Sequence, residues 1–141
     1  MTTENDRDSA RCRTAGRYLS DRDKWHSWAV NQFVSLRPPV ISCEAVLSEA
    51  SFLTRRNGGE PVDILRMLQR RAFEIPFDLE TEASSVEALM RRYSDAPMSL
   101  ADACLVRLCE LQQDCRVLTL DRHFARYRRH GRQVIPLLAP W

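Results

Sequence analysis

The chain has 141 residues, of which 44% are hydrophobic, and its formal net charge at pH 7 is +2. This length suits one domain with a real core, and so small a charge excludes the strong overall positive field of a highly basic nucleic-acid-binding protein. No apolar run approaches transmembrane length and residues 1–20 are polar, so we expect neither a membrane span nor a secretory signal, and a cytoplasmic location.

The predicted elements alternate between helices and short strands along the chain. Apolar residues at helical spacing, together with stop signals such as Pro38-Pro39 and Asn57-Gly58-Gly59, predict helices over 21–36, 43–56, 61–72, 81–93, 99–113 and 123–128. Short apolar runs predict strands at 40–41, 73–77, 116–120 and 134–138. Strands separated by helices favour an α/β fold in three layers, with a central parallel sheet flanked by helices.

Two aspartates stand at the edges of apolar elements in the second half of the chain. Asp102 lies in the first turn of a strongly apolar helix, and Asp121 directly follows a short apolar strand. In a strand-helix-strand arrangement they can converge at one end of the sheet, where carboxylates bind a hard cation such as Mg²⁺. Each has a structural alternative, because Ser99-x-x-Asp102 matches a capping box and Asp121 can cap the following helix.

Glu49 and Asp95 are further acidic candidates. The neighbours of Glu49 at helical spacing include Ala45, Val46 and Leu53, so its carboxylate is expected on an apolar face, where it needs a cation or a salt bridge. Asp95 precedes Pro97 in a polar loop, where the ordinary interpretation is a turn residue and the alternative is a supporting role near the site.

The basic and sulfur-containing residues carry weaker signals. Arg122, Arg126 and Arg128 belong to an arginine cluster that can follow an RNA backbone or form a solvated basic surface. The five cysteines contain no CxxC motif, and we expect reduced thiols in the core. They are Cys12, Cys43, Cys104, Cys109 and Cys115.

Four segments in order resemble the PIN-domain family, specifically the VapC-type toxins of bacterial toxin–antitoxin pairs. They are Trp25-His-Ser-Trp-Ala-Val30, Ile41-Ser-Cys-Glu-Ala-Val-Leu-Ser-Glu-Ala50, Tyr93-Ser-Asp-Ala-Pro-Met-Ser-Leu-Ala-Asp-Ala103 and Leu118-Thr-Leu-Asp-Arg-His-Phe124. The resemblance covers the chain from about residue 21 to the C-terminus, so we expect a PIN-like, Rossmann-like domain over 21–141 after an atypical segment over 1–20.

The resemblance implies a metal-dependent endoribonuclease with RNA as substrate. It places the family's acidic residues on Glu49, Asp102 and Asp121, with Thr119 in a supporting role, and it implies Mg²⁺, or alternatively Mn²⁺, as the cofactor. The reaction expected is hydrolysis of an RNA phosphodiester bond by water that the metal activates. The implied partners are a cognate antitoxin and a second copy of the chain in a homodimer.

The sequence departs from the family pattern at its beginning. Family members start with an apolar central strand that ends in Asp, whereas residues 10–19 contain three arginines and no acid, so the first strand is degenerate or missing. Three explanations stay open: an altered reading frame or start, a degenerate member with weakened catalysis, or substitution by another acid such as Asp8. The competing function is a catalytically inactive module that acts through protein–protein contacts.

Overall fold

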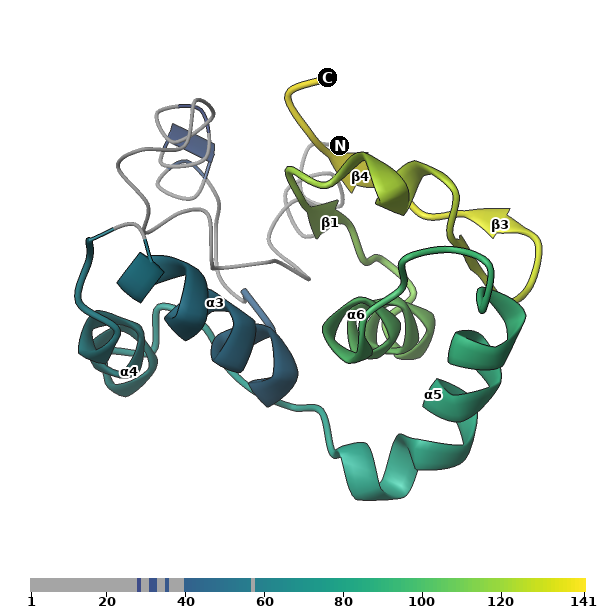
Figure 1. The fold of residues 1–141 in the computed structure, drawn as a ribbon, viewed down its shortest axis with the longest axis horizontal. Coiled ribbons are helices and arrows are strands. Elements are labelled where there is room, and N and C mark those ends of the chain that lie inside the picture. Colours follow the sequence, from purple (N-terminus) through teal and green to yellow (C-terminus); the bar gives the residue numbers. More distant parts are fainter. Residues whose placement is uncertain (1–27, 29–30, 33–34, 36–39, 57) are drawn as a thin grey trace.

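The computed structural model of the protein describes residues 28, 31–32, 35, 40–56 and 58–141 (Figure 1). Its named elements are α3 (Glu44–Arg56), α4 (Val62–Gln69), α5 (Leu79–Arg92), α6 (Leu100–Leu111), β1 (Val117–Leu118), the 3-10 helix η2 (Arg122–Ala125), β2 (Arg128–Arg129), β3 (Gln133–Val134) and β4 (Leu137–Leu138). The helix predicted over 21–36 falls mostly outside the described residues, although Trp28, Asn31, Gln32 and Ser35 are helical. No helix in the described part of the chain is long and apolar enough to cross a bilayer.

The four predicted helices between 43 and 113 are confirmed, with small differences at their ends. Gly58 follows α3 with a φ of 84°, a left-handed conformation that glycine adopts without steric cost. α4 ends at Gln69 rather than at residue 72, and Arg71 then takes a φ of 60°. α6 ends at Leu111 because Gln112 has already become extended, with φ −117° and ψ 109°.

The predicted strands are shorter in the structure than in the sequence analysis. Those at 40–41 and 73–77 reduce to a single parallel bridge between Ile41 and Glu74. Pro76 has no N–H to donate to a ladder, which explains why the pairing does not extend beyond this point. The strand at 116–120 becomes β1, which pairs in parallel with β4 in the register Val117 to Leu137 and Leu118 to Leu138.

The C-terminal segment contains a hairpin that the sequence analysis missed. The predicted strand at 134–138 is divided in two, since β3 pairs antiparallel with β2 while β4 pairs with β1. The predicted helix at 123–128 is the short η2, and Arg128 belongs to a strand instead. His130 and Gly131 make the turn with φ values of 51° and 77°, a backbone geometry that apolar periodicity does not predict.

The helix α6 lies at the centre of the described structure (Figure 1). It packs against α3 on one side and α5 on the other, and β2 also contacts it. Eight of its twelve residues are buried, as its almost entirely apolar sequence requires. A part-buried ion pair of 2.6 Å between Arg107 Nε and Glu82 Oε1 further joins α6 to α5.

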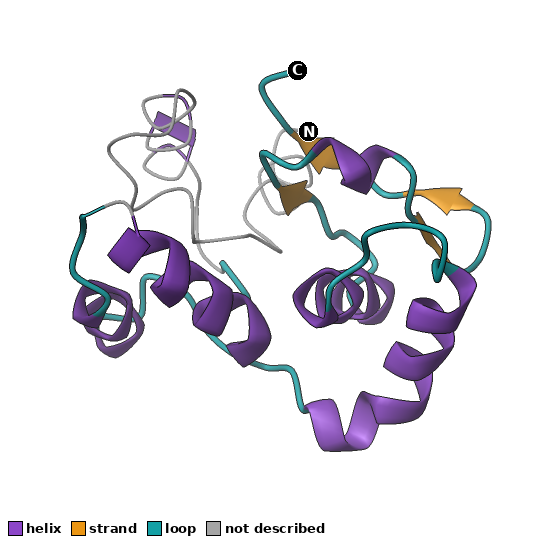
Figure 2. Ribbon diagram, in the orientation of Figure 1, coloured by secondary structure: helices purple, strands orange, loops and turns teal. Residues whose placement is uncertain are grey.

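The architecture is therefore α/β, with four α-helices and a small parallel sheet among the described residues (Figure 2). A second apolar cluster lies between α3 and α4 and includes Leu47, Ala50 and Ile64. A complete central sheet with helices on both faces stays a prediction. The place of its first strand, over residues 10–19, lies outside the described residues.

Candidate metal centre

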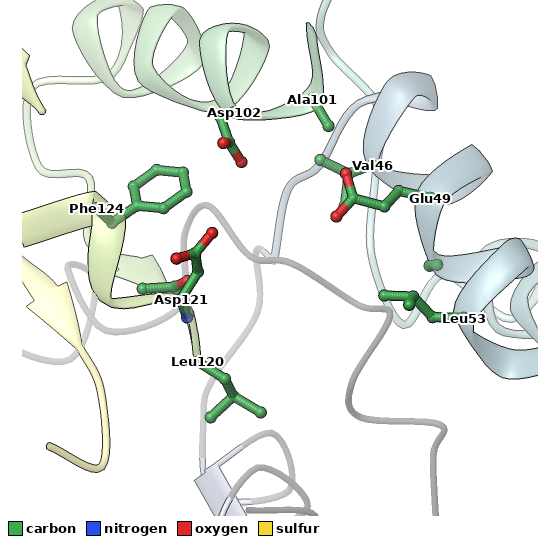
Figure 3. A pocket seen from close by; sticks show the side chains of 10 residues that line it. Val46, Glu49, Leu53, Ala101, Asp102, Leu120, Asp121 and Phe124 are labelled. Carbon is green, nitrogen blue, oxygen red and sulfur yellow. Dashed lines mark hydrogen bonds between the residues drawn. The ribbon is translucent and has the colours of Figure 1, made fainter. Parts of the chain in front are cut away.

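A pocket of about 130 Å³ opens between α3, the start of α6 and the segment that joins β1 to η2 (Figure 3). Glu49, Asp102 and Asp121 all line it, together with Thr119. The remaining lining residues are mostly apolar: Val46, Ala50, Leu53, Ala101, Leu120 and Phe124. The three acids selected from the sequence thus reach the same pocket from three separate elements, with the carboxylates of Asp102 and Asp121 pointing toward one another (Figure 3).

Asp102 is both a helix cap and a lining residue of this pocket. Its Oδ2 accepts a hydrogen bond of 3.2 Å from the Ser99 backbone N–H, and the Asp102 N–H donates to Ser99 Oγ at 3.1 Å. These two bonds form the predicted capping box, which is confirmed. Asp102 is only 8% exposed, so its burial exceeds what a cap on the surface of a helix requires. The structural and pocket-lining interpretations of Asp102 are therefore compatible.

The pKa of Asp102 is raised above its ordinary value. Burial is the main cause, and the negative charge of Asp121 acts in the same direction. Hydrogen bonds from Ser99 and Tyr127 lower this pKa, but they do not outweigh the burial. A positive charge between Asp102 and Asp121 would stabilise the ionised form of Asp102, because it would offset both the burial of this carboxyl group and its repulsion by Asp121.

Tyr127 is a neighbour of the site that was not among the candidate site residues of the sequence. Its hydroxyl donates a 3.3 Å hydrogen bond to Asp102 Oδ2, and its side chain is fully buried. The ring centres of Tyr93 and Phe124 each lie 5.1 Å from the ring centre of Tyr127, in edge-on contact. Burial and the nearby charge of Asp102 raise the pKa of Tyr127 well above its usual range, so the phenol stays a donor. The signal in the sequence was its three-residue spacing from Phe124, which marks a core position.

Asp121 is held by the turn that it initiates. Its Oδ1 accepts the His123 backbone N–H at 2.9 Å and lies 2.7 Å from the ring nitrogen Nδ1 of the same histidine. Thr119, which is almost fully buried, accepts the Asp121 N–H on its hydroxyl oxygen at 2.9 Å. The predicted capping of η2 by Asp121 is thus observed, and Thr119 contacts the backbone of Asp121.

Glu49 reaches the pocket from its rim, and the expectation that it is buried was wrong. Its side chain is exposed, while Val46 one turn earlier is buried. Phe52, a further apolar residue at helical spacing from Glu49, is itself 64% exposed. The reason is that α3 contacts α6 and α4 through Val46, Leu47 and Ala50, a narrower apolar stripe than the sequence indicates.

The other predicted residues lie away from the pocket lining. Asp95 is exposed in a turn, as its loop position indicates, and Asp8 lies outside the described residues. Arg122 and Arg126 are exposed, and the guanidinium of Arg122 lies 5.4 Å from the centre of the Trp141 ring. Arg128 serves the fold instead, because its Nη1 donates to the backbone carbonyls of Ala125 and Tyr127 at 2.8 and 3.0 Å.

The cysteines follow the expectation of core thiols in part. Cys43, Cys104 and Cys109 are free and buried. Cys115 is the exception because it is disulfide-bonded, which corrects the expectation of reduced thiols at this position. It stands between α6 and β1, outside the helical apolar pattern that contains Cys104 and Cys109.

The donors around the pocket are those of a hard divalent cation. They are carboxylate oxygens, with no sulfur or imidazole nitrogen among the lining residues. Within the described ranges, no three His, Cys, Asp or Glu side chains are grouped as a ready ligand set. Mg²⁺ is commonly held by one or two carboxylates while water completes its octahedron, and the facing pair of Asp102 and Asp121 fits that mode.

Comparison with known protein families agrees with this geometry. Residues 17–130 match the family model of the PIN domain, which spans most of the chain. The protein therefore belongs to the PIN-domain family, whose members are generally metal-dependent nucleases. The chain matches none of the curated proteins with which it was compared.

Proposed function

We propose that this protein is a metal-dependent endoribonuclease that hydrolyses RNA phosphodiester bonds. The observation that carries the proposal is that Glu49, Asp102 and Asp121 line one pocket in a chain of a nuclease family. We further propose the VapC-type subtype, a toxin that pairs with a cognate antitoxin, forms a homodimer and acts in the cytoplasm. These finer assignments rest on the ordered sequence segments that resemble this subtype.

The site residues divide into ligands and groups that hold them. We assign Asp102 and Asp121 to direct binding of Mg²⁺ or Mn²⁺, and Glu49 to the opposite wall, where it acts directly or through water. A divalent cation bound there would supply the positive charge that favours ionisation of water and offsets charge developing on the phosphate. Thr119 holds the backbone at Asp121, and Tyr127 holds Oδ2 of Asp102. The fourth acid of the family pattern, with Asp8 as candidate, stays a prediction.

The surface around Asp121 is suited to an RNA backbone. Arg122 and Arg126 are exposed and follow Asp121 closely in the chain, so their guanidinium groups can bind phosphates beside the scissile bond. Asp121 also contacts the His123 ring, which fixes the orientation of an exposed imidazole at the same end of the site. Arg128 is left out of this role because its guanidinium binds backbone carbonyls.

A cleavage assay on the full chain tests the proposal. A structured RNA with a fluorophore and a quencher is incubated with Mg²⁺, and chelation with EDTA gives the metal-free control. We expect Asp121→Asn and Asp102→Asn each to lower the rate by about 100-fold or more, because each removes a charged ligand. Glu87→Gln is the matched control, since this exposed carboxylate on α5 pairs with Arg91 and lies outside the pocket. Full activity in both Asn variants would refute the assignment.

The alternative function is a catalytically weakened module that acts through protein–protein contacts. The raised pKa of Asp102 favours it, because a carboxyl group that resists ionisation is a poorer cation ligand. The cleavage assay distinguishes the two functions. Absence of Mg²⁺-dependent cleavage in the wild-type chain, with the fold intact by circular dichroism, would favour the interaction module, whereas cleavage that Asp121→Asn abolishes would exclude it.

A further inference from the structure

Cys43 and Cys104 meet between α3 and α6, away from the carboxylate pocket. Cys43 immediately precedes α3 and Cys104 lies in the second turn of α6. Both are free, both are only 1% exposed and both belong to the same core cluster. Both also line one cavity, and a hydrogen bond from the Cys104 thiol is the largest influence on the pKa of Cys43. The function proposed above uses neither residue.

The surroundings of Cys43 favour its ionised, nucleophilic form. The hydrogen bond from Cys104 lowers the pKa of Cys43, and the backbone N–H groups of Ala45 and Val46 act in the same direction. Burial and the charge of Glu44 oppose them without reversing the direction. Because a thiolate, and not a thiol, attacks an oxidant, Cys43 is the more reactive member of the pair.

A small pocket gives a reagent access to the two sulfurs. Cys43 and Cys104 line a cavity of about 170 Å³ whose other walls include Glu44, Asp78 and Glu80. A water molecule occupies about 30 Å³ in the liquid, so the cavity has room for a molecule as small as hydrogen peroxide. The three acids at its walls are exposed and disfavour an anionic reagent such as glutathione disulfide.

We propose that Cys43 and Cys104 are a peroxide-sensitive thiol pair that closes to a disulfide between α3 and α6. The Cys43 thiolate attacks one oxygen of hydrogen peroxide, so an S–O bond forms as the O–O bond breaks and hydroxide leaves. The Cys104 sulfur then attacks the sulfenic acid sulfur, and the S–S bond forms as the S–O bond breaks. The two thiols lose two electrons and two protons in total, and the peroxide becomes two molecules of water.

The cross-link would join the two helices that carry Glu49 and Asp102. In a reducing compartment a disulfide of this kind is transient and regulatory, since thiol reductants reopen it. The proposed disulfide does not depend on the proposed nuclease function, because the disulfide is detected by mass and its detection requires no cleavage of RNA.

Peptide mapping of the oxidised full chain tests the proposal. Trypsin places Cys43 in the peptide 25–55, Cys104 in 93–107, and both Cys109 and Cys115 in 108–116, so a link between Cys43 and Cys104 differs in mass from a link between either of them and the peptide 108–116. After brief treatment of the native protein with hydrogen peroxide, we expect the linked peptides 25–55 and 93–107, two hydrogen atoms lighter than their sum. Dithiothreitol should restore both thiols, and glutathione disulfide should react more slowly than peroxide.

Variants at matched positions separate this pair from general thiol oxidation. Cys104→Ala should abolish the linked species. Oxidation of Cys43 should then stop at the sulfenic acid, which dimedone labels, and it should be slower because the hydrogen bond from Cys104 that lowers the pKa of Cys43 is lost. Cys109→Ala is the control, because burial raises the pKa of Cys109 to about 11 and its thiol should not take part. The peptide map of the wild-type chain tests the proposal even if a variant fails to fold. Recovery of both Cys43 and Cys104 as free thiols after peroxide, or pairing of Cys43 with the peptide 108–116, would overturn the proposal.

Discussion

Replacement of Tyr127 by Phe removes one buried hydroxyl and leaves the ring in place. The lost interaction is the 3.3 Å hydrogen bond to Asp102 Oδ2. Hydrogen bonds to charged groups contribute about 1.5–3 kcal/mol, and this long bond belongs at the weak end, so we expect a loss of about 1.5 kcal/mol near pH 7. The edge-on contacts with Tyr93 and Phe124 persist, so packing adds little. In a chain of this size the loss corresponds to a fall in Tm of about 6 °C.

The pH dependence of this loss distinguishes the Tyr127–Asp102 bond from a general packing effect. The folded pKa of Asp102 is raised, so its protonated form contributes stability that is fully present below the unfolded pKa of about 3.9 and is lost as pH rises through the folded pKa. The Tyr127 hydroxyl lowers this pKa, and Tyr127→Phe therefore raises it further. The destabilisation should thus be small at pH 4 and grow toward pH 7, as measured by urea unfolding at each pH.

Tyr93→Phe provides the matched control for this experiment. Its hydroxyl accepts the Arg128 backbone N–H at 2.9 Å, and this donor does not titrate between pH 4 and 7. The same substitution there should cost a similar amount at every pH in that interval. Equal pH profiles for the two Phe variants, or an unchanged stability of Tyr127→Phe at pH 7, would show that the reasoning on Asp102 is wrong.

Three further predictions concern stability and are each tested by thermal melts. Asp102→Asn should raise Tm at pH 7, because the amide oxygen can still accept the hydrogen bonds from Ser99 and Tyr127 without the cost of a buried charge. This gain in Tm should vanish below about pH 4, where the carboxyl group of the wild type is protonated. A lower Tm of the variant at pH 7 would contradict the prediction. Ser99→Ala should cost about 1 kcal/mol at pH 7 through loss of the cap on α6. Gly131→Ala should lower the free energy of unfolding by about 1 kcal/mol or more, since its φ is 77° and a Cβ would stand 3.0 Å from Arg92 Nη1. Gly59→Ala is the control, because Gly59 does not have a positive φ.

The helices and the N-terminal cap of α6 could be predicted because their signals are local. Ser99 and Asp102 stand three residues apart before an apolar run, and the capping box they predict is present. The buried face of α6 follows in the same way from its composition. The exposed side of α3 could not be predicted, because Phe52 and Val46 are equally apolar and only the positions of α4 and α6 decide which of them is covered.

The strands were predicted less well, since a strand forms only where the backbone of a second segment pairs with it through hydrogen bonds. The runs at 73–77 and 134–138 have strand composition, yet one forms a single bridge and the other is divided between two sheets. The hairpin β2–β3 depends on the left-handed turn at His130 and Gly131, and its strand Arg128–Arg129 carries no apolar alternation at all.

The sequence by itself determined the residues to which we assign the chemistry. They belong to an ordered set of short segments, with Glu49 and Asp102 in helices and Asp121 after a strand. The tertiary structure decided their environments. It brings the three acids to one pocket, makes Asp102 a buried carboxyl beside Asp121, and sets the Tyr127 hydroxyl against it. The physical reason is that residue type and helical spacing are properties of the local chain, whereas burial, and the pKa shift it causes, arise only when distant elements exclude water together.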